Sequence, residues 1–199
     1  MKNSHCEFWF EVGRYSPYHL GHQNKTNLMR QKYGSQCASA IGSAEIFLKL
    51  HDMYTYTQRK RFIETIHPGH IIDGLNDIPW NDDARIEQLI KTIGKYYKGD
   101  IKNVEFFGGN EEDIIRFYDK WFSCTIVDRF DDQQSTVISG TQVRKTILDS
   151  YRMQNADFAK TKLQWSIDPR IIDDVVDTYF ANMDQLKKNS LELITHLMQ

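Results

Sequence analysis

The sequence predicts an α/β fold: a Rossmann-like, doubly wound parallel sheet with helices on both faces and a helical C-terminal segment. Two observations lead to this expectation. Short runs rich in aromatic and β-branched residues alternate with amphipathic stretches of roughly 10–15 residues. The two strongest motifs also both lie in connections from a strand to a helix. Alternation of this kind is typical of βαβ units, whose parallel sheet is covered on both faces.

Each predicted strand is a short apolar run with a turn former or a helix after it. The first, Phe8 to Val12, is aromatic and is stopped by Gly13. The expected strands are residues 8–12, 39–42, 70–72, 104–107 and about 124–127.

The predicted helices follow from capping residues, apolar periodicity and proline positions. Thr57 is the expected N-cap of a helix that must end before Pro68, because proline disfavours the helical conformation in the residue preceding it. The expected helices run from about Leu20 to Tyr33, from Thr57, from Asn81 or Asp82, through Ile114 to Tyr118, from Ser139 or Thr141, and from Asp168–Pro169 onward. We expect one Rossmann-like domain over residues 1–150 and a packed helical extension over residues 151–199.

The composition restricts the classes of function. The chain has 199 residues, of which 40% are hydrophobic, and a net charge of −2, which gives no overall field for holding a nucleic acid backbone. Three scattered cysteines form no C-x-x-C pair, which favours a reducing compartment. The N-terminus lacks a signal-peptide core, and no apolar run is long enough to span a bilayer. We therefore expect a cytoplasmic protein with no nucleic acid and no membrane partner.

The first motif, Gly13-Arg14-Tyr15-Ser16-Pro17-Tyr18-His19-Leu20-Gly21-His22, directly follows the first predicted strand. Gly13 permits a sharp turn, and Gly21 removes a side chain where a ligand would touch the backbone. A helix beginning near Leu20 offers free N–H groups to an anion. His19 and His22 share one face of its first turn, and Arg14 adds a charged fork suited to phosphate. The segment therefore predicts a phosphate cradle.

The second motif, Ile138-Ser139-Gly140-Thr141-Gln142-Val143-Arg144, precedes another predicted helix. Ser139 or Thr141 can cap that helix, and capping alone would explain their presence. Arg144 in the first turn nevertheless adds a second anion site. Two such sites suit a triphosphate held from both ends.

Two histidine pairs, His67 with His70 and His19 with His22, have a spacing that a metal could use. No nearby cysteine pair and no carboxylate at ligand spacing accompanies them, and no protein metal site is expected.

The first motif resembles the H-x-G-H signature of the nucleotidyltransferase superfamily. Its G-R-x-x-P-x-H-x-G-H form is most similar to the nicotinamide-nucleotide adenylyltransferases, and the S-G-T-x-V-R form of the second motif resembles the archaeal-type branch. The resemblance implies that His19 and His22 polarise the ATP phosphates with help from Arg14. It also implies that Arg144, with Ser139 and Thr141, holds the β- and γ-phosphates.

Looser matches to the same family lie between the two motifs. Tyr54 to Arg59 resembles F-T-A-G-E-R, which makes Arg59 a further implied phosphate contact, and Gly108-Gly109-Asn110 resembles S-G-N near the adenine. Residues 41–44 resemble I-G-S-A, and residues 78–85 resemble the acceptor-binding I-P-D-x-x-x-N-A segment. The implied acceptor contacts are Ser43, Trp80 and Asp83. The family's stacking tryptophan is replaced by Ile86, and Trp80 is the candidate substitute.

The resemblance implies adenylyl transfer from ATP to nicotinamide mononucleotide, giving NAD and pyrophosphate, with Mg²⁺ on the phosphates and no protein metal ligand assigned. It also makes a homo-oligomer a candidate assembly. Two alternatives stay open. One is a nucleotidyltransferase for another phosphate acceptor, an alternative that is supported by Ile86 in place of the family's tryptophan. The other is a nucleotide-binding sensor without turnover.

Overall fold

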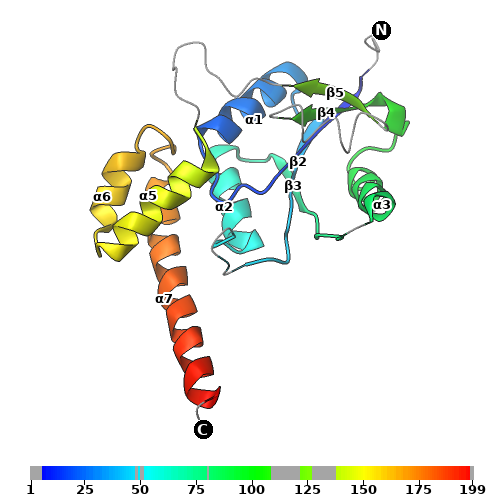
Figure 1. Cartoon of the computed structure of the whole chain (residues 1–199). Helices are drawn as coiled ribbons and strands as arrows, with labels where there is room; N and C mark the ends of the chain where they lie inside the picture. Colours follow the sequence, from blue (N-terminus) through cyan, green and yellow to red (C-terminus); the bar gives the residue numbers. More distant parts are fainter. Residues whose placement is uncertain are drawn as a thin grey trace.

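The computed structural model describes residues 6–47, 49, 52–79, 81–108, 122–126 and 138–197, with side chains up to residue 189. In this part of the chain, five strands form one parallel sheet in the order β3-β2-β1-β4-β5. The strands are β1 (Phe8–Gly13), β2 (Cys37–Ile41), β3 (Ile71–Gly74), β4 (Val104–Gly108) and β5 (Ser123–Ile126). The chain winds outward from β1 to β3 and then returns to place β4 on the other side of β1 (Figure 1). This confirms the predicted doubly wound parallel sheet, with its reversal point between β1 and β4.

The described helices are α1 (Leu20–Tyr33), α2 (Tyr56–Ile66), α3 (Asp82–Ile93), α5 (Gly140–Arg152), α6 (Ala156–Leu163) and α7 (Ile172–Leu197), with a short 3-10 turn at Ile101–Asn103. The limits of α1 are as predicted, and Asn81 caps α3 by accepting from the Ala84 N–H at 2.9 Å. The predicted helix through residues 114–118 lies outside the described residues.

The predicted N-cap of α2 was wrong. The cap is Thr55, whose extended backbone turns into the helix and whose hydroxyl accepts from the Gln58 N–H at 3.2 Å. The Gln58 side chain accepts from the Thr55 N–H in return at 2.8 Å, which completes a capping box. Thr57 lies inside the first turn instead. The helix ends at Ile66, before Pro68, as expected.

Alternate residues of β1 point to opposite faces of the sheet, and each face has its own helices. Phe8 and Phe10 pack with α3 residues such as Leu89. Trp9 packs on the other face with Met29 of α1. The sheet is therefore covered on both sides, as predicted.

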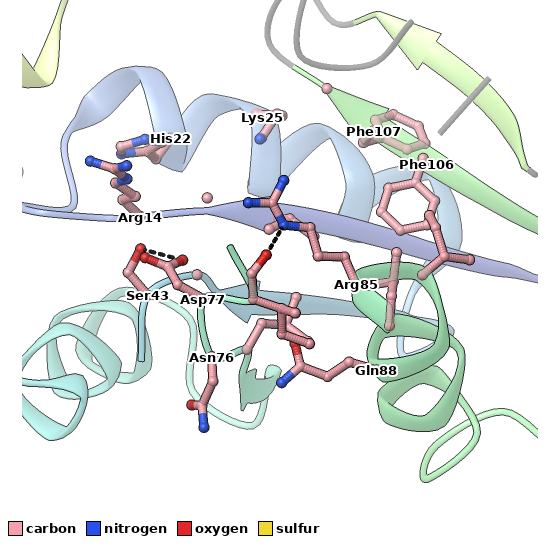
Figure 2. Close-up of a pocket in the computed structure, with 18 of the residues that line it drawn as sticks. Arg14, His22, Lys25, Ser43, Asn76, Asp77, Arg85, Gln88, Phe106 and Phe107 are labelled. Carbon is pink, nitrogen blue, oxygen red and sulfur yellow. Dashed lines mark hydrogen bonds between the residues drawn. The ribbon is translucent and has the colours of Figure 1, made fainter. Parts of the chain in front are cut away.

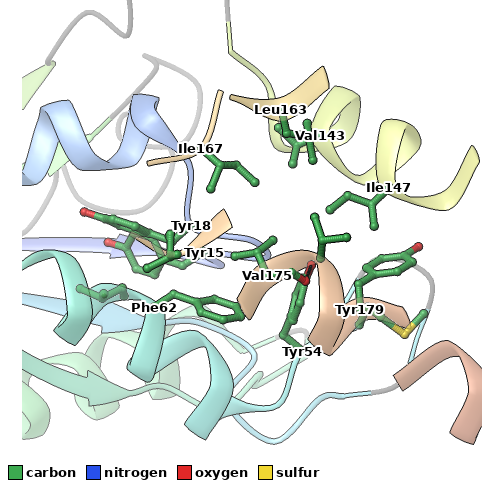
Figure 3. Packing of buried hydrophobic residues seen from close by; sticks show 14 of the residues in the cluster. Tyr15, Tyr18, Tyr54, Phe62, Val143, Ile147, Leu163, Ile167, Val175 and Tyr179 are labelled. Carbon is green, nitrogen blue, oxygen red and sulfur yellow. Dashed lines mark hydrogen bonds between the residues drawn. The ribbon is translucent and has the colours of Figure 1, made fainter. Parts of the chain in front are cut away.

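The C-terminal helices pack on the α2 side of the molecule (Figure 3). Their apolar side chains join one cluster with α2 and with Tyr15 and Tyr18 of the loop after β1, both 1% exposed. The expected domain boundary at residue 150 falls inside α5, and the division into two domains stays a prediction. Within the described chain, none of the helices is both long and apolar enough to cross a membrane.

Candidate active site

A cavity of about 440 Å³ opens at the carboxyl ends of β1 to β4 (Figure 2). This is where ligands bind in doubly wound sheets, at the point where the strand order reverses. Figure 2 shows Arg14 and His22 toward one end, Phe106 and Phe107 toward the other, and Arg85 reaching in from α3 between them. The lining residues are Val12, Gly13, Arg14, His19, Gly21, His22, Lys25, Gly42, Ser43, Leu75, Asn76, Asp77, Ile78, Arg85, Ile86, Gln88, Leu89, Phe106, Phe107 and Gly108.

The start of α1 forms one end of this cavity. His19 is the N-cap of the helix, and the His19 and His22 rings stack with their centroids 3.8 Å apart. The side chain of Arg14 is 63% exposed, with its Nη1 3.8 Å from the Asp52 carboxylate. The Leu20 N–H already donates to the Ser166 carbonyl at 2.9 Å. What gathers at the start of α1 is therefore the two imidazoles and the Arg14 guanidinium at the positive end of the helix dipole, an arrangement suited to phosphate (Figure 2).

Two glycines of the first motif allow this close packing. A Cβ on Gly21 would lie 3.1 Å from the His19 ring, and a Cβ on Gly13 would lie 2.8 Å from the Tyr15 ring. Tyr15 itself has a φ of +50°, which non-glycine residues rarely adopt. The loop is thus held in one unusual conformation, a feature that clusters at functional sites.

The second motif meets the first at the start of α5. Ser139 caps α5 by accepting from the Gln142 N–H at 3.1 Å. A Cβ on Gly140 would lie 3.7 Å from the His19 ring. The Arg144 guanidinium donates to the Ser16 carbonyl at 2.8 Å and to the Thr141 hydroxyl at 3.1 Å. These residues lie beside the cavity rather than on its lining, and they bring the two motifs together across the fold.

Arg59 is placed differently from the expected phosphate contact. It is fully buried and does not line the cavity. Its Nη atoms donate to the carbonyls of Arg14 at 3.1 Å, Gly42 at 2.9 Å and Ser43 at 2.8 Å, with a longer bond to Ile46. The guanidinium thus fastens the loop after β1 to the loop after β2, because a planar fork of donors can serve several carbonyls at once.

The residues predicted to contact the acceptor lie in different places. Ser43 lines the cavity, has a φ of +51°, and donates to the Asp77 carboxylate at 2.9 Å. Asp83 is exposed on the first turn of α3 and is not among the lining residues. Ile86 lines the cavity at the position where the family has tryptophan. Trp80, like Asn110 on the adenine side, lies outside the described residues.

Several lining residues were not predicted from the sequence. Lys25 follows His19 and His22 at intervals of three, so helical spacing alone would have placed it on their face. Arg85 and Gln88 share a face of α3 in the same way. Phe107 has no comparable signal, because it reads as an ordinary strand residue.

A buried carboxylate, Glu11, lies beneath the cradle. Its Oε2 is 3.0 Å from the Lys25 ammonium, and its Oε1 accepts from Ser39 at 2.5 Å and from Thr26 at 2.8 Å. Burial alone would raise the pKa of Glu11, but the charge of Lys25 and the hydrogen bonds from Ser39 and Thr26 bring it below its ordinary value. Glu11 thus stays ionised and holds the Lys25 charge at the wall of the cavity.

Two buried histidines are connected to the Glu11 carboxylate by hydrogen bonds that run through hydroxyl groups. The His70 Nε2 lies 2.7 Å from the Ser39 hydroxyl, and the His67 Nε2 lies 2.8 Å from the Tyr18 hydroxyl. Since Ser39 donates to Glu11, it accepts from His70, and Tyr18 accepts from His67 in the same way. Burial lowers the pKa of both imidazoles to about 4. These histidines are therefore neutral structural donors.

Solved structures with a similar fold are known, although no match was found by sequence. No protein-family model matches the sequence. None of the curated proteins matches it either. Two crystal structures of a bifunctional NMN adenylyltransferase/ADP ribose pyrophosphatase from Francisella tularensis are similar to it. The one complexed with AMP and Mn ion has a TM-score of 0.65 and 18% identity, covering 96% of this chain and 55% of that chain. The other has a TM-score of 0.66, 17% identity and coverage of 96% and 56%.

A NadR protein in complex with NR is also similar, with a TM-score of 0.50, 17% identity, and coverage of 73% of this chain and 41% of that chain. This chain thus spans little more than half of the Francisella enzyme. At such low identity the likeness concerns the fold, and it identifies the architecture as one found in NMN adenylyltransferases.

Proposed function

We propose that this protein transfers the AMP part of ATP to the 5′-phosphate of nicotinamide mononucleotide, forming NAD and releasing pyrophosphate. The observation that carries the proposal is the stacked His19–His22 pair at the start of α1. It lies at the reversal point of the sheet, beside Arg14 and the second motif. The similar fold of NMN adenylyltransferases supports it.

In this reaction the acceptor phosphate is the nucleophile, so no covalent enzyme intermediate is needed. An acceptor oxygen attacks the α-phosphorus in line, its bond to phosphorus forms as the bond to the β-phosphate bridging oxygen breaks, and pyrophosphate leaves. Catalysis then depends on positioning and on stabilising the charge that builds on the phosphoryl oxygens. In the proposal, His19, His22 and the positive end of the α1 dipole face those oxygens, and Lys25 and Arg14 supply fixed positive charge.

The second motif completes the proposed phosphate site from the other side. Arg144 already bonds the Ser16 carbonyl of the first motif, so its charge is held next to the cradle. Ser139 and Thr141 accompany it at the start of α5. Pyrophosphate is the leaving group, and these three residues are the ones we assign to its two phosphates.

Mg²⁺ would enter with ATP. The described residues contain no group of three or more His, Cys, Asp or Glu side chains suited to holding a metal. We assign the ion mostly to phosphate oxygens and water, the usual state of protein-bound Mg²⁺. When bound, the ion would neutralise phosphate charge, while the residues above hold and orient the phosphates.

The test is to incubate the protein with ATP, Mg²⁺ and nicotinamide mononucleotide and to follow NAD and pyrophosphate. His22→Ala is the key variant. We expect kcat to fall by a hundredfold or more with little change in KM, because the contact strengthens in the transition state. Dinucleotide formation that is equally fast in His22→Ala would contradict the assigned site. Pyrophosphate release that requires a different phosphate acceptor would favour the alternative nucleotidyltransferase, and ATP binding without any release would favour a sensor.

A further inference from the structure

A buried carboxylate, Asp52, lies next to the phosphate cradle, and the proposed reaction gives it no role. It belongs to the loop between β2 and α2, and its side chain is 7% exposed. The Asp52 N–H donates to the Lys49 carbonyl at 2.8 Å, and the neighbouring Met53 and Tyr54 are fully buried. The packing of the loop therefore fixes the position of this carboxylate.

The negative charge of Asp52 acts on several arginines at once. Its Oδ2 lies 3.8 Å from the Nη1 of Arg14, which lines the cavity. Burial lowers the pKa of Arg144 and of Arg59, and the charge of Asp52 is the largest one that opposes this effect in both. The charge of Arg14 lowers both pKa values further. Guanidinium groups that repel one another thus share the field of one carboxylate.

The interaction of Asp52 with Arg14 is one of charge rather than of hydrogen bonding. A separation of 3.8 Å is longer than a hydrogen bond, and the Arg14 side chain is mostly exposed. The Asp52 Oδ1 is buried and has no hydrogen-bond partner among the residues that the structure describes. Replacing Asp52 by asparagine therefore removes the charge, keeps the shape and breaks no side-chain hydrogen bond to Arg14.

Two other carboxylates of the site have close partners of their own. Glu11 lies 3.0 Å from the Lys25 ammonium. Asp77, on the lining of the cavity, accepts from the Ser43 hydroxyl at 2.9 Å (Figure 2). Both keep their charge when Asp52 is replaced, so a comparison of the wild type with Asp52→Asn reports on the charge of Asp52 alone.

A carboxylate in this place weakens the binding of polyphosphates. ATP and pyrophosphate bring several negative charges close to Arg14 and Arg144, and the negative charge of Asp52 repels them. In the empty site the same charge offsets the repulsion between the two guanidinium groups. Weaker binding of pyrophosphate means faster release, and product release limits the turnover of many enzymes.

We propose that Asp52 sets the affinity of the site for polyphosphates, so that its negative charge speeds the release of pyrophosphate. The proposal rests on the proposed function and deepens it. Asp52 acts through the field that it shares with Arg14 and Arg144, and it is assigned no contact with the reacting atoms.

The test measures the dissociation constants of pyrophosphate and ATP by titration calorimetry, without an acceptor and therefore without turnover. Asp52→Asn should bind both about tenfold more tightly at low ionic strength, because a like charge is removed from a partly desolvated site. AMP should gain less, and adenosine should gain nothing because it carries no charge. The gain should shrink as salt is added. In turnover, pyrophosphate should inhibit Asp52→Asn at a correspondingly lower concentration.

Asp174→Asn is the matched control. Asp174 of α7 pairs with Arg61 of α2 at 2.6 Å rather than with an arginine of the two motifs, so the same loss of charge there should leave both dissociation constants unchanged. Asp52→Glu keeps the charge and should bind pyrophosphate as the wild type does. Asp52→Ser removes the charge as well, and it replaces Asp52→Asn in the test if that variant does not fold.

Four results would overturn the proposal. Unchanged binding of pyrophosphate in Asp52→Asn removes the effect of the charge. Weaker binding of pyrophosphate and ATP makes Asp52 a brace for Arg14, and weaker binding of ATP alone assigns its buried oxygen to the nucleoside. An equal gain for adenosine indicates a change of shape.

The proposed function fails separately from this inference. A wild type that binds neither ATP nor pyrophosphate refutes both. A wild type that binds them but forms no dinucleotide refutes the proposed function, and the dissociation constants of Asp52→Asn still decide whether its charge sets the affinity.

Discussion

Replacing Glu11 by glutamine should destabilise the protein strongly, because Glu11 neutralises a charge that has little access to water. The Lys25 ammonium is 3.0 Å from the carboxylate, and the two side chains are 8% and 0% exposed. Glutamine keeps an oxygen that can accept from Ser39 and Thr26, so the main loss is the negative charge. Removing one partner of a buried pair costs about 3–5 kcal/mol. For a chain of this length that corresponds to a fall in Tm of about 6–20 °C.

Urea unfolding of the wild type, Glu11→Gln, Lys25→Met and the double variant measures this effect. The double variant should lose less than the sum of the single changes, since it leaves no uncompensated charge. Glu11 has a folded pKa below its unfolded value, so its contribution is present above about pH 4.3 and is lost as pH falls through the folded pKa. A loss below about 1 kcal/mol for Glu11→Gln at neutral pH, or strict additivity, would refute the pairing.

Three further predictions concern the frame around the cavity. Arg59→Lys should raise KM for both ATP and the acceptor several-fold, because an ammonium cannot replace the fork that joins the two loops, and an unchanged pair of KM values would contradict that role. Thr55→Ala should lower the unfolding free energy by about 1 kcal/mol in urea, with the exposed Thr57→Ala as a control that changes little. The unfolding free energy of the wild type should fall as pH decreases from about 6.5 to 4, since His67 and His70 are neutral in the fold and take up protons on unfolding. His70→Gln should make this dependence on pH less steep, and an unchanged dependence would argue against the role of His70.

Local chemistry explains what the sequence could predict. The limits of α1, the cap of α5 and the strand–motif–helix order all depend on residues close to one another in the chain. The cap of α2 was misplaced because Thr55 and Thr57 are both plausible, and only the reciprocal bond with Gln58 separates them.

The functions of individual arginines depend on contacts far along the chain, which is why they were harder to predict. The match to a family motif places an arginine at position 59 of the sequence. It does not tell whether the Arg59 guanidinium faces a ligand or, as in the structure, backbone carbonyls. Arg85 was part of a loosely matched segment, and its place on the lining of the cavity appears only when α3 packs on the sheet. Charge position within a cavity is a property of the assembled fold.

Because the first motif packs against the C-terminal helices, the phosphate cradle can take its final form only after those helices have folded onto it. Tyr15 and Tyr18 are buried in the same apolar cluster as Val143 of α5 and Val175 of α7 (Figure 3). The Ser16 carbonyl accepts a hydrogen bond from Arg144, 128 residues away in the chain. During synthesis, the sheet and the walls of the cavity emerge before the helices that cover this loop. Long-range contacts of this kind form late, because their loop-closure entropy must be overcome first. The ability to bind ATP tightly should therefore appear only at the last stage of folding, which makes it a sensitive reporter that the C-terminal helices have docked.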